Sequence, residues 1–392
     1  MRKKLKDVCM FYSGTGFPIQ YQGQTKGEYP FYKVGDIANN AIAGKIYLEL
    51  CNNYISSDVA KMIKGCILPK DTVVFAKIGE ALKLNRRAIT SCDCLIDNNA
   101  MGIAPKLDSL RIQYFYFCMK NLKMQTLAES TTVPSVRKTV LEKYEIEVPS
   151  LVEQEEIEKK LTLTQKIIEK RRQELSYLDE IIKARFVEMF GNPVTNEKGW
   201  KQRQLGEITT KIGSGATPKG GKEAYQEEGI TLIRSMNVHN GLFEYKELAH
   251  ISEEQAEKLD NVTIEENDVL LNITGASVAR SCVVPSKILP ARVNQHVCII
   301  RCNQCIVPEF LNKLLIDDNY QRLLWSIAEA GATREAITKQ QVESLQIIMP
   351  PIELQEQFAD FVHQVDKSKV AVQKALDETQ ILFDSLMQKY FG

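Results

Sequence analysis

The chain has 392 residues, of which 44% are hydrophobic and 26% charged, and its 50 basic and 50 acidic residues leave no formal net charge. This composition excludes a disordered or fibrous chain, and the length is enough for two hydrophobic cores. No apolar run approaches ~18 residues and no hydrophobic stretch follows the basic start MRKKLKD, so we expect no membrane span, no secretory signal and a cytoplasmic protein.

An internal repeat of about 200 residues organises the chain. The pattern VPSLVEQEEI at 148–157 returns as MPPIELQEQF at 349–358, an offset of 201. Upstream, TVVFAKIGEA at 72–81 aligns with DVLLNITGAS at 268–277, an offset of 196, and FYKVGDI resembles LIRSMNV. A repeat this long predicts two copies of a domain, each with an appendage.

The two globular units are predicted over 1–150 and 191–350. Short apolar or alternating runs such as DTVVFAKI, DVLLNIT and HVCIIRC indicate strands. SLRIQYFYFCMKNLKMQTLAE and PEFLNKLLIDDNYQRLLWSIAE indicate one helix each, at matching positions. Each unit is therefore predicted as α+β, with strands first and a helical region near its end. The glycine-rich runs YSGTGFP and KIGSGATPKGG indicate loops near the start of each unit.

Each unit leads into a predicted helix with coiled-coil spacing, within 151–190 and 351–392. Seam positions alternate by four and three from Ile157 to Met189, and again from Phe358 to Tyr390, and most but not all of them are apolar. Each helix would have about 34 residues and a length of roughly 50 Å. Because the second unit starts where the first helix ends, we predict an antiparallel pair with the two chain termini close together. The alternative is that each helix packs on its own domain.

No motif in this chain indicates catalysis or a bound metal. The ten cysteines are scattered, and the pairs Cys302/Cys305 and Cys92/Cys94 lie in different units without a second pair at zinc-site spacing. We therefore expect reduced, structural thiols. The chain lacks a Gly-Lys-Ser/Thr phosphate loop, the [Asp/Asn]-Pro-Pro-aromatic motif of adenine methyltransferases, and a visible nucleophile paired with one of its four histidines.

Read in order, the motifs resemble those of the specificity subunit of a type I restriction-modification system in its two-domain form. They are the two Pro-x-x-x-x-Gln segments before the heptad helices, then GWKQRQLGEITTKIGSGATPK, LIRSMNV, DVLLNITGASVAR, VNQHV and GATREAI. The resemblance covers the full length. The first unit departs from it, with IGEALKLNRRA in place of a TGAS-type loop and DNNAMG in place of VNQHV.

The resemblance implies two similar target recognition domains separated by a long antiparallel two-helix coiled coil, related by a pseudo-twofold internal repeat. Each domain would read one half of a bipartite double-stranded DNA target with a fixed gap. The helices would dock two modification subunits and two restriction subunits. The chain itself would be non-catalytic and hold no cofactor, with S-adenosylmethionine, ATP and Mg in the partner subunits.

Charge and loop position select candidate DNA-binding residues. Residues 1–150 hold 21 basic and 14 acidic side chains, whereas the rest of the chain is slightly acidic, so we expect only modest DNA binding by the isolated chain. Lysines suit phosphates, arginines also suit guanine edges, and amides suit adenine. The candidates are Lys33, Lys77, Lys83, Asn85, Arg86, Arg87 and Asn98, then Lys219, Lys222, Arg234, Asn237, Thr274, Ser277, Arg280, Asn294 and Gln295.

Three alternatives to this reading stay open at this stage. A coiled-coil adaptor that binds only proteins would show no DNA dependence. A stand-alone DNA methyltransferase or endonuclease would need a catalytic motif, and none is found. A system that only methylates DNA would use the same kind of subunit, because the restriction subunit is another chain.

Overall fold

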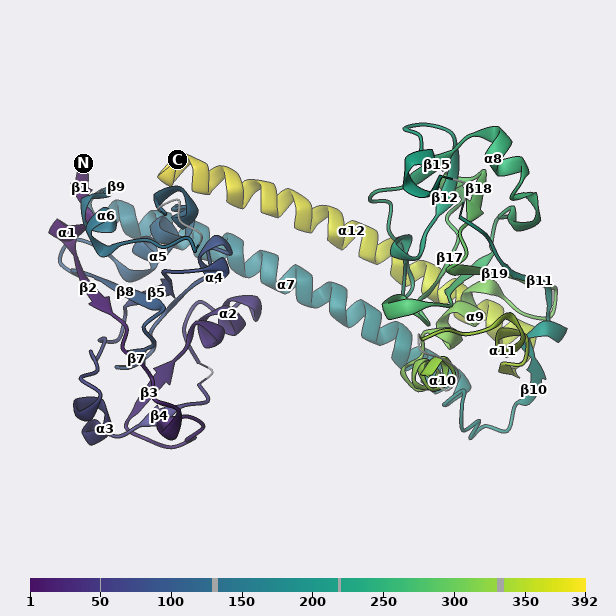
Figure 1. The fold of residues 1–392 in the computed structure, drawn as a ribbon, viewed down its shortest axis with the longest axis horizontal. Helices are drawn as coiled ribbons and strands as arrows, with labels where there is room; N and C mark the ends of the chain where they lie inside the picture. The colour runs from purple at the N-terminus through teal and green to yellow at the C-terminus, as the bar shows by residue number, and fades with distance from the viewer. Residues whose placement is uncertain (50, 129–132, 218–219, 330–334) are drawn as a thin grey trace. The chain divides into compact units, whose positions relative to one another are not determined.

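The computed structural model describes residues 1–49, 51–128, 133–217, 220–329 and 335–392 (Figure 1). The chain divides into two compact units. Unit 1 comprises Met1–Gln173 and Gln373–Gly392, and unit 2 comprises Glu174–Val372. Each unit thus contains one globular part together with a portion of both long helices. The four-part division predicted from the sequence stays a prediction.

Unit 1 is built around a four-stranded antiparallel sheet. Its strand order is β2 (Cys9–Ser13), β8 (Ala100–Pro105), β5 (Val73–Ala76), β6 (Arg87–Ile89). Every residue of β5, β6 and β8 is buried, because other elements cover both faces of these strands. A second sheet has the order β4 (Tyr54–Ile55), β3 (Tyr29–Tyr32), β7 (Leu95–Ile96), and β1 (Arg2–Lys4) pairs with β9 (Glu145–Glu147).

Unit 2 repeats this topology strand for strand. Its four-stranded sheet has the order β11 (Thr209–Ser214), β19 (Val297–Cys302), β16 (Val269–Asn272), β17 (Ser281–Val283). Its three-stranded sheet is β15 (Ala249–Ile251), β12 (Ile230–Ile233), β18 (Ala291–Val293), and β10 (Lys201–Gln204) pairs with β20 (Gln346–Met349). In both units the middle strand of the three-stranded sheet has one parallel and one antiparallel neighbour. Unit 2 adds a hairpin of β13 (Val238–His239) and β14 (Leu242–Phe243). The predicted α+β duplication is confirmed.

Short helices flank these sheets. The two helical regions predicted near the end of each globular part have other bounds in the structure. Unit 1 has α1 (Leu5–Val8), α2 (Val34–Ile42), α3 (Ser57–Met62), α4 (Glu80–Lys83), α5 (Ile112–Asn121) and α6 (Lys138–Lys143). Unit 2 has α8 (Glu253–Glu257), α9 (Pro308–Leu315), α10 (Asp318–Glu329) and α11 (Lys339–Glu343). The single helix expected after Pro308 is two helices, because Asp317 Oδ1 accepts hydrogen bonds from the amides of Asn319 and Tyr320 and so caps a new one. The helix expected to reach 129 ends at Asn121.

The two long helices, α7 (Leu151–Phe190) and α12 (Ile352–Phe391), each span 40 residues rather than about 34. In unit 2 they run antiparallel. Phe190 lies 5.4 Å from Phe358 between ring centroids, and the Lys369 ammonium lies 2.6 Å from the Asp179 carboxylate. All the predicted seam positions from Ile157 to Met189 and from Phe358 to Tyr390 are buried or half-buried. The antiparallel prediction is therefore confirmed.

The carboxyl end of α12 belongs to the same unit as the amino end of the chain. The ring centroids of Phe117 and Phe383 lie 6.2 Å apart, and Asn121 Nδ2 donates to the carbonyl of Phe391 at 2.9 Å. Figure 1 shows this end of α12, in yellow, beside α5. Each long helix thus packs both on its partner helix and on a globular part, so the alternative interpretation of the helices also holds in part.

A buried glutamine fastens the start of each long helix. Gln154 and Gln355 occupy matching places in the repeat and neither side chain is exposed. Gln154 Oε1 accepts from the Arg111 amide at 2.8 Å, and Gln355 Oε1 accepts from the Val307 amide at 3.0 Å. The Nε2 group of each glutamine donates to the proline carbonyl five residues earlier, at 2.9 Å. The repeated Pro-x-x-x-x-Gln spacing therefore joins a helix to a globular part. No helix among the described residues is long and apolar enough to cross a membrane.

Candidate nucleic-acid interface

The same turn appears in both units, and the residue at its centre has an exposed side-chain amide. In unit 1 Asp97 Oδ1 accepts from the Asn99 amide at 2.9 Å, and in unit 2 Asn294 Oδ1 accepts from the His296 amide at 3.0 Å. The residue between them, Asn98 in unit 1 and Gln295 in unit 2, is exposed. The fold therefore places two of the predicted amides at equivalent positions.

A glycine lets the first loop of each unit pack against this turn. A Cβ on Gly14 would lie 1.7 Å from the carbonyl oxygen of Asp97, and one on Gly215 would lie 1.7 Å from that of Val293. Only a residue without a side chain tolerates so close an approach of two backbones. The Gly215 amide also donates to the carbonyl of Asn294 at 3.1 Å. The glycine-rich loops predicted from the sequence are thus part of the candidate interface.

In unit 2 the contacts bring four polar side chains together. Thr274 Oγ1 is hydrogen-bonded to His296 Nδ1 at 2.5 Å, and Gln295 Nε2 lies 3.0 Å from His296 Nε2. The hydroxyl of Thr217 donates to Gln295 Oε1. Sequence reasoning selected Thr274 and Gln295 but missed Thr217 and His296. The signal for His296 was present, because it directly follows the two amides in VNQHV.

The segments LIRSMNV and DVLLNITGAS adjoin in unit 2. The buried Asn272 donates from Nδ2 to the carbonyl of Ser235 at 2.9 Å. Arg280 Nη1 lies 3.5 Å from His239 Nδ1, while the Arg234 guanidinium lies 5.5 Å from the Tyr225 ring centroid. Two half-exposed arginines therefore lie on neighbouring segments of unit 2.

In unit 1, Lys33 and Lys77 adjoin the turn that carries Asn98. Asp97 Oδ2 accepts from the amide of Val34 at 3.0 Å, which places Lys33 next to the turn. The ammonium of Lys33 lies 2.5 Å from Gln22 Oε1, and the Lys77 amide donates to the carbonyl of Asn99 at 2.9 Å. These three candidates form one group.

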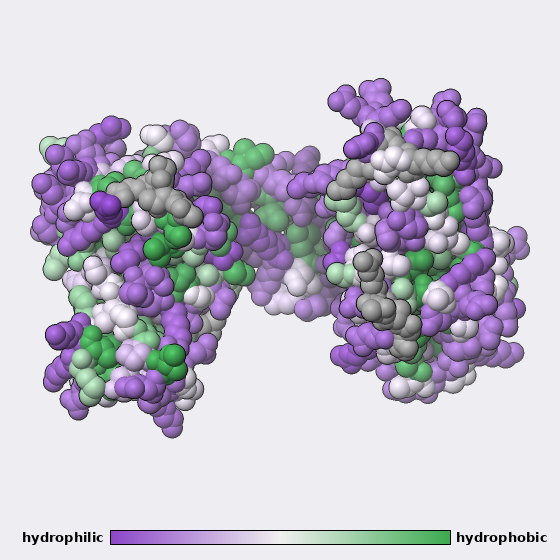
Figure 2. Space-filling view, viewed as in Figure 1, coloured by the Kyte–Doolittle hydropathy of each residue, from purple (hydrophilic) through white to green (hydrophobic). Residues whose placement is uncertain are grey.

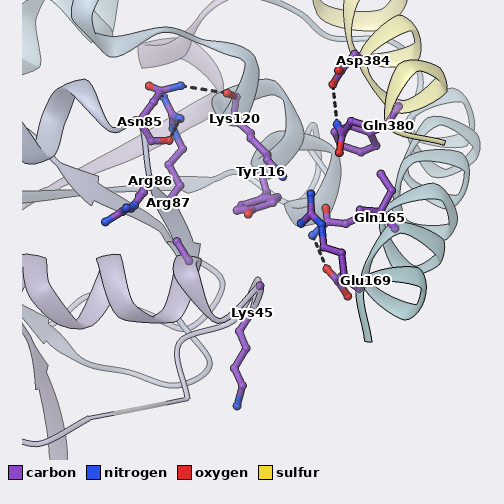
Figure 3. A pocket seen from close by; sticks show the side chains of 15 residues that line it. Lys45, Asn85, Arg86, Arg87, Tyr116, Lys120, Gln165, Glu169, Gln380 and Asp384 are labelled. Atoms are coloured by element: carbon purple, nitrogen blue, oxygen red, sulfur yellow. Dashed lines mark hydrogen bonds between the residues drawn. The ribbon is translucent and has the colours of Figure 1, made fainter. Parts of the chain in front are cut away.

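The other unit 1 candidates lie beside the long helices. Asn85, Arg86 and Arg87 line a pocket of about 370 Å³ together with Tyr116 and Lys120 of α5, Gln165 and Glu169 of α7, and Asp384 of α12 (Figure 3). Figure 3 shows Arg87 turned toward Asn85, and Arg86 turned away from α7 and α12. Lys83 forms an ion pair with Glu80 at 2.6 Å.

Arg87 is a structural residue in this fold. Its side chain is 3% exposed and donates to the carbonyls of Asn85 and Leu122 and to Asn85 Oδ1. Burial lowers its pKa to about 10. Asn85 Oδ1 also accepts from the Met124 amide at 3.1 Å, and Asn85 has a positive φ of 53°. Both side chains hold the loop of Arg86 against the end of α5.

Two unit 2 candidates are buried as well. Asn237 accepts from the amide of Arg234 and donates to the carbonyls of Glu244 and Lys246, and Asn294 caps its own turn. Asn237, Asn294 and Arg87 thus shape loops. All three side chains are buried, so a direct contact of any of them with DNA stays a prediction. Half-exposed or exposed positions are Lys33, Lys77, Lys83, Asn85, Arg86, Asn98, Arg234, Thr274, Ser277, Arg280 and Gln295. Lys219 and the side chain of Lys222 lie outside the described part of the chain.

The cysteine thiols of the chain are unpaired, and burial raises the pKa of several of them. The structure records all ten cysteines as free, and burial raises the pKa of Cys282, Cys298 and Cys302 to about 12. Within the described ranges, no three histidine, cysteine, aspartate or glutamate side chains come together as metal ligands.

The molecule is thus a duplicated α+β protein in which one scaffold is used twice and presents different exposed polar side chains each time. A family model described as the type I restriction modification DNA specificity domain matches residues 1–177 and 197–379. The chain belongs to this family of type I restriction-modification specificity subunits.

Relatives and solved structures agree with this assignment. The MjaIX specificity subunit of a type I restriction enzyme from Methanocaldococcus jannaschii is 23% identical, over 99% of this chain and 91% of its own length. The MjaVIII specificity subunit from the same organism is 22% identical, over 95% of this chain and 89% of its own length.

A solved S subunit of the type I system from M. genitalium covers 100% of this chain and 96% of its own chain, with a TM-score of 0.59 and 14% identity. A second solved structure, from a study of complex assembly and conformational transition of the type I R-M system, covers 100% of this chain and 97% of its own chain. Its TM-score is 0.59 and its sequence identity is 17%. At these identities the structural likeness shows the fold.

Proposed function

We propose that this chain reads a bipartite DNA target, with one unit on each half-site and a fixed gap between them. The observation that carries this proposal is the duplicated turn, which presents Asn98 in unit 1 and Gln295 in unit 2 from the same backbone arrangement. Different side chains on one scaffold would read different sequences, because base edges in the major groove differ in their donors and acceptors. Nearby lysines and arginines would contact phosphates.

We further propose that the long helices dock two modification subunits and, in the complete enzyme, two restriction subunits. Large hydrophobic side chains are exposed along both helices, and Figure 2 shows hydrophobic residues, in green, among the hydrophilic ones on this face of the molecule. They are Leu151, Val152, Leu163, Tyr177, Ile181, Val187, Val370, Ile381 and Leu382. The adjacent Ile381 and Leu382 are both exposed, and a contiguous exposed apolar patch favours a protein-binding surface. The chain would then be non-catalytic, with S-adenosylmethionine, ATP and Mg bound by its partners.

The test is to co-express this chain with its modification subunit in a host that lacks adenine methylation. Every methylated adenine is then mapped by single-molecule sequencing. Methylation at a two-part motif with a constant gap is the expected result. A stable complex that modifies no site would overturn the proposal.

The exposed apolar side chains of the helices also fit a second candidate, a protein adaptor that does not read DNA. The two functions differ in their dependence on salt, because phosphate contacts weaken steeply as salt rises and apolar contacts do not. Footprinting of the complex on its methylated target at 50 mM and 200 mM salt separates them. A footprint that is lost at the higher salt supports DNA reading, and the lack of any footprint supports the adaptor.

A further inference from the structure

The exposed amide of Gln295 is braced on both sides. Thr217 donates its hydroxyl hydrogen to Gln295 Oε1 on one side. On the other, Gln295 Nε2 meets His296 Nε2 at 3.0 Å, and His296 Nδ1 meets Thr274 Oγ1 at 2.5 Å. Four side chains from three loops therefore form one continuous chain of hydrogen bonds, with Gln295 as its exposed member.

The Gln295 side-chain amide keeps some of its hydrogen-bonding groups unused. A side-chain amide has two N–H donors and two oxygen lone pairs. In the observed arrangement one N–H faces His296 and one lone pair faces Thr217. One N–H and one lone pair remain free, and the same is true if the amide is turned by 180° so that its oxygen accepts from His296 Nε2–H and its NH2 donates to Thr217 Oγ1. This pair on one planar group matches N7 and the N6 amino group of adenine in the major groove.

We propose that His296 is a positioning residue which, together with Thr217 and Thr274, holds Gln295 ready to read an adenine in the half-site of unit 2. This inference rests on the proposed DNA-reading function. Glutamine has many rotamers, and a bound DNA would otherwise have to order them at an entropic cost. Bracing the amide before binding removes that cost and makes a wrong base pair more unfavourable, because the amide cannot turn to suit it.

Unit 1 provides an internal comparison. In the matching turn, Asn98 takes the place of Gln295 and Asn99 that of His296. Ile78 takes the place of Thr274, because the two form equivalent isolated β-bridges, Ile78 with Ser135 and Thr274 with Ala336. An isoleucine cannot continue a hydrogen-bond chain. The brace is therefore a feature of unit 2, and substitutions in it should affect only one half of the target.

The experiment uses the complex of the full chain with its modification subunit. The probes are duplexes with the mapped target and a panel in which each base pair of both half-sites is replaced in turn. Methylation kcat/KM is measured for Gln295→Ala, for His296→Ala and for the double variant. Gln295→Ala should reduce the preference for one A·T pair of one half-site about tenfold or more. His296→Ala should reduce the preference at the same pair, and the double variant should equal Gln295→Ala.

Two further variants guard against a loss of folding and a general effect. Thr217→Val removes one exposed hydroxyl at nearly constant shape, so it should fold normally and still weaken discrimination at that A·T pair. Asn98→Ala should affect only the other half-site. Unchanged discrimination in Gln295→Ala and Thr217→Val, loss at a G·C pair, or an equal loss in both half-sites for His296→Ala would overturn the inference. If the unaltered complex modifies no bipartite target, the proposed function fails first and the inference fails with it.

Discussion

Gly14 and Gly215 illustrate how a single residue shapes the interface. Each lies where a loop backbone meets the carbonyl oxygen of a strand end, and no side chain fits between them. Other glycines of the same loops are free of this constraint, since a Cβ on Gly16 or Gly213 would meet nothing within 4 Å. The close approach thus requires glycine at Gly14 and Gly215, whereas Gly220 and Gly221 have positive φ values of 98° and 59°, which favour glycine for a separate reason.

Gly215→Ala should therefore displace the loop and separate Thr217 from Gln295. The methyl group would have to push apart two backbone segments, which costs about 1–3 kcal/mol in packed sites. We expect a lower melting temperature and weaker discrimination in the unit 2 half-site. Gly213→Ala is the matched control and should leave both unchanged. Equal melting temperatures for the two variants would contradict the close approach seen in the structure.

Arg87 and Arg86 are adjacent in sequence and differ in role. Arg87→Ala would leave buried carbonyls without donors, so we expect a loss of about 2–4 kcal/mol in the free energy of unfolding. Arg86→Ala at the half-exposed neighbour should change stability by less than about 0.5 kcal/mol but weaken DNA binding if Arg86 contacts a phosphate. Urea denaturation and DNA titration of both variants distinguish the roles. A stable Arg87→Ala chain would show that its buried bonds are dispensable.

At the scale of elements, capping groups decide where helices begin and end. Asp317 starts α10 and so divides a hydrophobic pattern that reads as one helix into α9 and α10. Gln154 and Gln355 lie in the first turn of the long helices and join each helix to a globular part. Such groups act through backbone hydrogen bonds, which a hydrophobic pattern does not reveal.

Gln154→Glu tests this joint with almost no change of shape. The carboxylate would face the carbonyl oxygens of Ser109 and Pro149, to which the amide donates at 2.8 and 2.9 Å. It would also be a buried charge without a partner, so we expect a loss of about 2–4 kcal/mol. Gln364→Glu on the exposed face of α12 is the control and should cost less than about 0.5 kcal/mol. Chemical denaturation monitored by circular dichroism measures both losses. Similar midpoints for the two variants would show that the Gln154 hydrogen bonds do not stabilise the connection between α7 and the globular part.

At the scale of the whole molecule, both long helices pass from one compact unit to the other. The units divide between Gln173 and Glu174 in α7 and between Val372 and Gln373 in α12. Seam residues such as Leu175 and Leu376 lie close to these boundaries and are half-buried and buried, respectively. Each long helix is therefore continuous through the point where the chain passes from one unit to the other.

Inserting one matched heptad in both helices at these boundaries should lengthen the proposed gap between half-sites. Seven residues add about 10 Å of helix, which corresponds to roughly three base pairs of duplex. Methylation mapping should show the same two half-site sequences separated by a longer gap. A variant that folds and keeps the original gap, or one whose half-site letters change, would contradict the proposal that the helices set the spacing.

The sequence alone determined the duplication, the α+β class and the two heptad helices with their antiparallel direction. These features follow from periodic patterns and from connectivity, which are local properties of the chain or of its self-similarity. It also indicated loops at the glycine-rich runs near the start of each unit.

Only the tertiary structure decided which polar side chains are available. Arg87 and Asn85 read as exposed basic-loop residues, yet their polar atoms satisfy backbone groups from a segment about 35 residues away. Thr217 and His296 became visible as partners of Gln295 only when three loops were brought together. Burial and hydrogen-bond pairing depend on long-range contacts, and no pattern of residue types along the chain specifies them.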